Sequence, residues 1–118
     1  MTTRPGFFGL HLPCKYVRAR DGDTIEVQIL SGLTWAIRLI GVNCFERYTG
    51  EGKAATKFVK DVLEEADDLS VWLPAPKHAE NLLKNLTFDR VPGHVFVGES
   101  NLADMIVHAG HGAYTHAR

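Results

Sequence analysis

The sequence predicts a fold that is mainly β with helices (α+β), in which five strands close into a small barrel. Three observations lead to this expectation: apolar and polar residues alternate in the first third of the chain, a helical repeat follows, and two more strands precede a second helix. One long helix therefore follows strand 3, and a short helix follows strand 5. A closed barrel explains this order better than a parallel sheet, which requires strands and helices to alternate.

The first two strands are expected at 15–20 and 24–30, separated by an Asp-Gly-Asp turn, because Asp and Gly both favour turns. In the second strand apolar residues occupy alternate positions, so one face is buried and the other is wetter. A third strand is expected at 33–42, where the alternation continues through Trp35 and Ile37.

The loop between the second and third strands decides how their faces meet. A two-residue loop would pair Ile25 with Arg38, whereas a three-residue loop with a left-handed Gly32 would pair Ile25 with Ile37. We favour the longer loop because it gathers the apolar residues on one face. Arg38 then lies opposite Thr24, beside the Asp-Gly-Asp turn.

The clearest helix is expected at 51–66, where apolar residues recur at helical spacing and lysines fill the other side. Its apolar positions are Ala54, Ala55, Phe58, Val59, Val62, Leu63 and Ala66. A short strand at 69–73 follows, and the prolines after it end the strand.

The last third of the chain predicts one more strand and one more helix. The polar segment 77–85 is compatible with either a helical turn or a loop. A strand is expected at 91–97, broken or bulged near residues 92–93, where Pro and Gly occur together. The second helix is expected at 101–108, with an asparagine cap at its start and Gly110 as its end.

A chain of 118 residues is expected to form one domain, residues 1–118, with its own core. That core is expected at about 15–110, with 1–14 and 111–118 as flanking tails. No internal repeat is apparent.

The composition is ordinary for a soluble protein, with 45% apolar residues, 23% charged residues and a net charge of −1. This charge argues against a strong electrostatic hold on nucleic acid, although a local basic patch is compatible with it. Two cysteines fit a reduced, cytoplasmic setting. No segment is long enough to span a membrane, no secretory leader is recognised, and we expect a monomer.

The residues that carry chemistry flank the predicted hairpin. Asp21-Gly22-Asp23-Thr24 forms the first turn, Arg38-Leu39-Ile40-Gly41 ends the third strand, and Glu46 follows shortly afterwards. Together they offer oxygen ligands for a hard cation, a base for water and a cation for phosphate. These are the groups that a metal-assisted phosphodiesterase needs.

These motifs, followed by Gly50-Glu51 and an amphipathic helix, resemble the staphylococcal nuclease (thermonuclease) family. The resemblance runs from about Lys15 to Gly110. It implies a five-stranded OB-fold barrel and calcium-dependent hydrolysis of DNA, and possibly of RNA, that leaves 5′-hydroxyl and 3′-phosphate ends.

The resemblance also assigns a role to each matching residue. Asp23, Asn43 and the carbonyl of Cys44 take the positions of the Ca²⁺ ligands. Asn43 replaces a family aspartate, which removes one negative charge and should weaken calcium binding. Phe45 stands where the family often has proline, which should leave the following turn less rigid.

The catalytic residues implied by the resemblance are Arg38, Glu46 and Arg90. Glu46 orients or deprotonates the attacking water, and the two arginines bind phosphate and stabilise the charge of the transition state. Phe88 and Tyr114 are the expected nucleic-acid-binding residues.

Each residue also has a plain structural interpretation. Asp21 is more readily explained as a turn-former than as a ligand, Asn43 could cap a turn, and Arg90 could pair with Asp89. The six histidines do not form a zinc pattern. The lysines of the first helix read as a solvated face, with phosphate steering as a lesser role. The alternative function is a non-catalytic OB-fold module that binds nucleic acid or protein.

Overall fold

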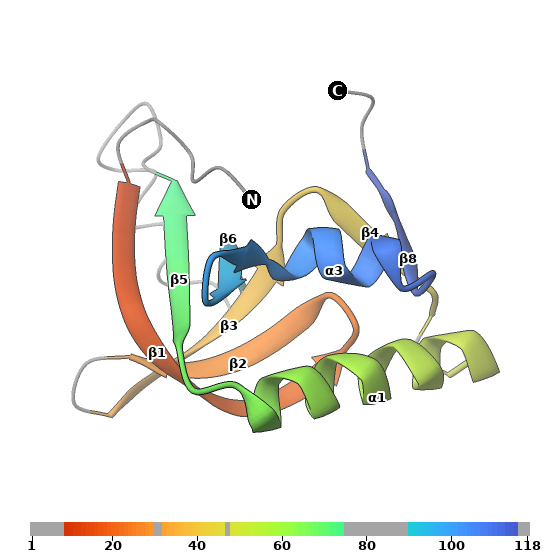
Figure 1. Ribbon diagram of the computed structural model, residues 1–118, viewed down its shortest axis with the longest axis horizontal. Coiled ribbons are helices and arrows are strands. Elements are labelled where there is room, and N and C mark those ends of the chain that lie inside the picture. Colours follow the sequence, from red (N-terminus) through yellow and green to blue (C-terminus); the bar gives the residue numbers. More distant parts are fainter. Residues whose placement is uncertain (1–8, 30–31, 47, 75–89, 116–118) are drawn as a thin grey trace.

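The computed structural model describes residues 9–29, 32–46, 48–74 and 90–115, and it confirms a closed barrel in a fold that is mainly β with helices. The five barrel strands are β1 Gly9–Asp21, β2 Thr24–Ile29, β3 Leu33–Leu39, β5 Leu69–Pro74 and β6 Arg90–Val97. They pair in the order β3-β2-β1-β5-β6, and a parallel pairing of β3 with β6 closes the circle (Figure 1). The result is an OB-like barrel.

β1 is longer than predicted, because it begins at Gly9. Its first half, residues 9–13, pairs with β5, and its second half pairs with β2. One strand thus pairs with two neighbours as the sheet curves into a barrel. The register shifts between Tyr16 and Arg18, as at a β-bulge, which bends a strand. The prediction that residues 1–14 form a tail is therefore wrong from Gly9 onwards, because from there the backbone pairs with other strands of the barrel.

The β2–β3 hairpin has the register that the apolar pattern favours. Ile25 pairs with Ile37, and Thr24 pairs with Arg38. Gly32 has a φ of 114°, the left-handed conformation that the three-residue loop requires. Both isoleucines are fully buried. This confirms the prediction that Arg38 lies beside the Asp-Gly-Asp turn.

A second, smaller sheet lies next to the barrel. β3 ends at Leu39, before its predicted end, because the chain turns at Gly41, whose φ is 90°. The next three residues form β4, Val42–Cys44, which pairs with β8, Gly112–Tyr114. The predicted flanking tail 111–118 thus contains a strand that pairs with β4. This corrects the prediction that the whole segment lies outside the folded core.

β6 is continuous, although the sequence predicts a break or bulge at Pro92 and Gly93. Up to Gly93 it runs parallel to β3, and from His94 it runs antiparallel to β5. A Cβ atom at Gly93 would lie 2.7 Å from Cδ2 of Leu73 and 3.2 Å from Cγ2 of Ile37. The glycine therefore allows close strand approach at the point where β6 changes partner.

The first helix, α1, spans Gly50–Glu65 and begins where predicted within one residue. The hydroxyl of Thr49 accepts a hydrogen bond of 2.9 Å from the backbone N–H of Gly52, which caps the helix. The predicted apolar face turns inward, except that Ala54 is exposed. The segment 77–85 lies outside the described residues.

The second helix is confirmed with both of its predicted ends. It is α3, Leu102–His108, and it follows the two-residue strand β7, Ser100–Asn101. The Asn101 side chain accepts a hydrogen bond of 2.9 Å from Ala103 N–H. Gly110 follows the helix with a φ of 83°, as a C-terminal glycine does.

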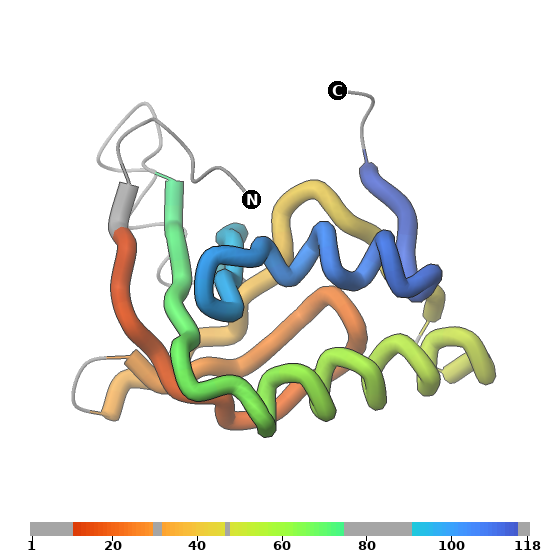
Figure 2. The backbone as a smooth tube through the Cα atoms, viewed as in Figure 1, coloured from red at the N-terminus to blue at the C-terminus, as the bar shows by residue number. Residues whose placement is uncertain are grey.

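The core is one apolar cluster shared by the barrel and both helices. Figure 2 shows α1 and α3 running side by side along the barrel, and the Phe58 ring of α1 lies 4.9 Å from the ring of His111 after α3. The largest buried aliphatic side chains are Ile25, Ile29, Ile37, Leu39, Leu63, Leu73, Leu102 and Ile106. In the part of the chain that the structure describes, no helix has the length and apolar character needed to cross a membrane.

Candidate functional site

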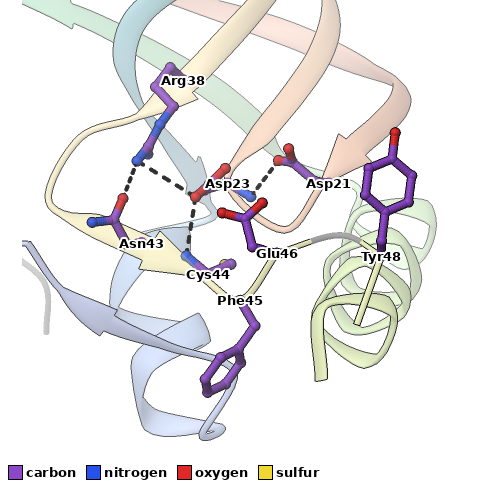
Figure 3. A pocket seen from close by; sticks show the side chains of 8 residues that line it. All are labelled: Asp21, Asp23, Arg38, Asn43, Cys44, Phe45, Glu46 and Tyr48. Carbon is purple, nitrogen blue, oxygen red and sulfur yellow. Dashed lines mark hydrogen bonds and ion pairs between the residues drawn. The ribbon is translucent and has the colours of Figure 1, made fainter. Parts of the chain in front are cut away.

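An open pocket of about 550 Å³ lies where the β1–β2 turn, the end of β3, strand β4 and the segment leading to α1 meet (Figure 3). It collects most of the residues that the motifs single out. Its lining residues are Asp21, Asp23, Arg38, Asn43, Cys44, Phe45, Glu46 and Tyr48. Five of the predicted site residues thus surround one space.

Three hydrogen bonds hold Asp23, one each through its N–H, its carboxylate and its carbonyl oxygen. Its own N–H donates to Oδ1 of Asp21 at 3.1 Å, which closes the turn. The N–H of Cys44 donates to Oδ2 of Asp23 at 3.1 Å, and the N–H of Leu39 donates to its carbonyl oxygen at 2.9 Å. The backbone of Asp23 is therefore fixed within the barrel hairpin, and its carboxylate is bound to β4.

Gly22 packs the same turn against β4 and α1. A Cβ atom there would lie 2.6 Å from Sγ of Cys44 and 3.0 Å from Cβ of Ala55. Real Cβ atoms do not approach neighbours so closely, so the turn reaches this position only with glycine. The glycine of the Asp-Gly-Asp motif thus sets the distance between the acidic turn and the helix.

Arg38 reaches across the pocket from β3. Its guanidinium donates to the carbonyl oxygens of Leu39 and Val42, the latter at 2.9 Å, and to the amide oxygen of Asn43. Its Nη2 lies 3.6 Å from Oδ2 of Asp23, which is an ion pair without a short hydrogen bond. The planar fork is thus positioned by its own chain, with the Asp23 carboxylate beside it.

The electrostatics of Asp23 favour a cation. Burial is the main cause that raises the pKa of Asp23 above its ordinary value of 3.8, and the hydrogen bond and charge of Asp21 add to it. The N–H of Cys44 and the charge of Arg38 oppose this rise without cancelling it. A positive charge bound between the two carboxylates would relieve their repulsion.

Cys44 contributes backbone atoms to the site and little thiol chemistry. Burial, followed by the charges of Asp23 and Asp21, raises the pKa of its thiol to about 12. The sulfur therefore stays protonated near neutral pH, and a protonated thiol is neither a nucleophile nor a metal ligand. The carbonyl oxygen is then the atom of Cys44 that could bind a cation.

Glu46 follows β4 and is exposed. Its carbonyl oxygen accepts hydrogen bonds from the Thr49 N–H at 3.0 Å and from the Thr49 hydroxyl at 2.7 Å, so the turn bearing Glu46 is tied to the start of α1. Its carboxylate points into the pocket, toward the acidic turn (Figure 3). The side chain therefore has access both to solvent and to the pocket.

The structure gives different information about the three other predicted residues. Arg90 begins β6, and its backbone pairs with Ala36 of β3, two positions before Arg38. Phe88 lies outside the described residues. Tyr114 lies on β8, where its hydroxyl donates to Oδ1 of Asp104 on α3 at 2.9 Å, and it does not line the pocket.

Three lining residues received no role in chemistry from the sequence. Asp21 was interpreted as a turn-former, and it both closes the turn and lines the pocket. Phe45 and Tyr48 are 51% and 77% exposed. The sequence contains one signal for these two residues. They are aromatic, they flank Glu46, and their segment has no apolar periodicity that would place them in the core.

The donors present suit a hard cation. The described residues contain no group of three or more His, Cys, Asp or Glu side chains arranged to hold a metal ion. Asp21 and Asp23 supply adjacent carboxylates, and the amide of Asn43 and the carbonyl of Cys44 supply neutral oxygens. Such a set fits Ca²⁺ only if water and a substrate phosphate complete its six to eight ligands.

Comparisons with known proteins add no family to this description. No model of a known protein family matches the chain, and no curated protein matches it. The resemblance to the staphylococcal nucleases therefore rests on the motif residues and on the OB-like fold.

Proposed function

We propose that this protein is a metal-dependent nuclease of the staphylococcal nuclease type that hydrolyses phosphodiester bonds of DNA and possibly of RNA. One observation carries the proposal: Asp23, Arg38 and Glu46, which come from three separate segments, line one open pocket. A carboxylate pair, an arginine fork and an exposed carboxylate in one space are the groups that hydrolysis of a phosphodiester requires.

Each residue has a role that follows from its placement. Asp21, Asp23, Asn43 and the carbonyl of Cys44 would hold the cation. Bound Ca²⁺ would polarise the scissile phosphate and offset its charge. Arg38 exchanges its hydrogen bond to Asn43 for phosphate oxygens, and this exchange frees the amide oxygen of Asn43.

Glu46 acts as the general base because its carboxylate reaches both solvent and the pocket. It takes a proton from water, the water oxygen bonds to phosphorus, and the bond from phosphorus to the 5′-oxygen breaks. The 5′-oxygen takes a proton from solvent, which leaves 5′-hydroxyl and 3′-phosphate ends. Arg90 is proposed as the second cation on the phosphate, because its backbone on β6 pairs with β3, the strand that carries Arg38.

A second candidate function has its own support. The guanidinium of Arg38 is already bonded to two backbone carbonyls and to Asn43, as a purely structural arginine would be. The alternative is therefore a non-catalytic OB-fold module that binds nucleic acid or a protein without cleaving it.

A cleavage assay distinguishes the nuclease from the binding module. It uses single-stranded and plasmid DNA across a range of calcium concentrations, with a chelator as the blank. We expect cleavage with calcium and none with chelator, and Glu46→Gln should bind DNA but lose most of the turnover. Glu99→Gln is the matched control, since Glu99 is exposed in the turn before β7. Intact substrate at every calcium concentration would favour the binding module and refute the nuclease.

A further inference from the structure

A second groove, of about 430 Å³, lies beside the pocket, between α1 and β1. We call it the lysine groove. Its lining residues are Arg20, Tyr48, Lys53, Thr56, Lys57, Lys60 and Asp61. The residues from α1 are spaced by three or four positions, so they form one face of the helix.

The lysine groove concentrates positive charge. Four of its residues are basic and one is acidic, whereas the whole chain has a net charge of −1. Lys57 pairs with Asp61 at 2.8 Å, and both side chains are more than half exposed, so this ion pair is weak. Lys53 and Lys60 are exposed and have no ion pair within the described residues. Arg20 pairs with Glu26 at 2.7 Å, so Lys53 and Lys60 are the uncompensated cations that the groove offers.

Tyr48 connects the two spaces, because it lines both the pocket and the lysine groove. It is 77% exposed, the most exposed large apolar side chain among the described residues. Figure 3 shows its ring beside α1, on the far side of the pocket from Arg38 and Asn43. An exposed aromatic ring next to a basic groove is what stacks an unpaired base while lysines follow the phosphates.

We propose that Tyr48 and the lysine groove bind a single-stranded segment of the nucleic acid whose scissile phosphate lies in the pocket. This inference rests on the proposed nuclease function, which names nucleic acid as the substrate. Binding to this surface does not itself require cleavage. From Lys53 to Lys60 the helix rises by about 10 Å. The three lysines therefore lie along one line on the helix, so they can contact more than one phosphate of the same strand.

The single-stranded form follows from Tyr48. A base in a duplex has both faces stacked on its neighbours, so it cannot lie on a protein ring without being unstacked. An unpaired base has a free face for Tyr48. A duplex could use the lysines but not the tyrosine, and it should therefore bind more weakly.

The test is fluorescence anisotropy with a labelled oligothymidylate in chelator, so that no cleavage occurs. Tyr48→Ala should weaken binding by about tenfold with an unchanged salt dependence, and Tyr48→Phe should bind as the parent does. The combined change of Lys53, Lys57 and Lys60 to Gln should reduce the slope of log K against log salt by about 2. Lys15→Gln, an exposed charge outside the lysine groove, is the control for a single lost lysine and should leave binding nearly unchanged.

Two outcomes would overturn the inference. One is binding by Tyr48→Ala and by the lysine variant equal to that of the parent protein. The other is equal affinity for the oligothymidylate and for a duplex of the same length. The binding measurement needs no metal and no turnover. Its result can therefore be interpreted even if the protein does not cleave DNA. Conversely, if the protein cleaves DNA with calcium but these variants bind as the parent does, the binding role of the lysine groove is refuted and the nuclease proposal stands.

Discussion

The pocket and the lysine groove share Tyr48 but are built in opposite ways. In the pocket, Asp23 and Arg38 are partly buried and fixed by backbone hydrogen bonds: Asp23 accepts from Cys44 N–H, and Arg38 donates to backbone carbonyls, whereas the Glu46 side chain is exposed. In the lysine groove, the three lysines of α1 are exposed and the helical repeat sets their spacing. Chemistry requires the first arrangement, because reacting groups must be placed before the substrate arrives. Binding of a polyanion requires only the second.

The two regions should also respond differently to salt. Exposed charges are screened within a Debye length of about 8 Å at physiological ionic strength, whereas partly buried charges are screened less. We therefore expect salt to weaken substrate binding through the lysine groove while changing turnover at saturating substrate only slightly.

The largest effect should come from Arg38→Lys, which keeps the charge but removes the planar fork. We expect kcat to fall by about 10²- to 10³-fold, the effect of losing a group that stabilises transition-state charge. Metal-free binding to oligothymidylate should change little. Lys15→Arg is the matched control on an exposed strand position. If Arg38→Lys retained full turnover, the arginine would be structural and the contrast between the two regions would disappear.

Gly22→Ala should destabilise the fold by about 1–3 kcal/mol, the usual cost of overpacking. The new methyl group would meet Sγ of Cys44 at 2.6 Å, so the turn must move away from β4. Urea denaturation measures the change. Gly50→Ala is the control, because a Cβ there meets nothing within 4 Å, and it should leave the free energy of unfolding unchanged or slightly higher. Equal stability of the two variants would show that the pocket is not tightly built.

Asn43→Asp should tighten calcium binding by about tenfold, or ~1.4 kcal/mol, because it adds a charged oxygen ligand. Calorimetry measures this, with Asn43→Ala as the variant that should lose affinity. Binding of oligothymidylate in chelator should not increase, since the change adds negative charge to the pocket only. An unchanged calcium affinity would mean that Asn43 is not a ligand.

The smallest effect should come from Glu26→Gln on β2. Arg20 beside Glu26, and then Arg18, hold the pKa of Glu26 below its usual 4.5. A lowered pKa means that the ion pairs stabilise the fold above pH 4.5 and that this contribution is lost as the pH falls through the lowered pKa. The variant should be less stable by about 1 kcal/mol or less at pH 7.

Thermal unfolding at several pH values tests this prediction, and the two proteins should converge on acidification. A difference that grew at low pH would contradict it. The variant also leaves Arg20, which lines the lysine groove, without that carboxylate, so oligothymidylate should bind slightly tighter.

The hairpin was predictable because two local rules agree. Alternating apolar residues and a left-handed Gly32 select one register, and that register places Arg38 beside Asp23. The N-terminal cap of α3 was predictable for the same reason, since Asn101 needs only the backbone of the next turn. Where a feature depends on neighbours in sequence, the pattern was sufficient.

Features made by distant contacts were not predictable. The start of β1 at Gly9 depends on β5, and the strand β8 depends on β4. Tyr114 is directed to α3 by its hydrogen bond to Asp104, which no local pattern encodes. The sequence indicated the lysine face of α1, but not that Arg20 of β1 lies beside it, because the two meet only when the barrel closes.

The two partly buried thiols have a practical consequence. Burial raises the pKa of Cys14 to about 11, and that of Cys44 is about 12, so almost no thiolate exists at neutral pH. Alkylating and oxidising reagents act on thiolate, so both native cysteines should react slowly. A cysteine introduced by Lys53→Cys on the exposed face of α1 should therefore accept a maleimide dye selectively. The protein is thus ready for single-site labelling without removal of its own sulfhydryls.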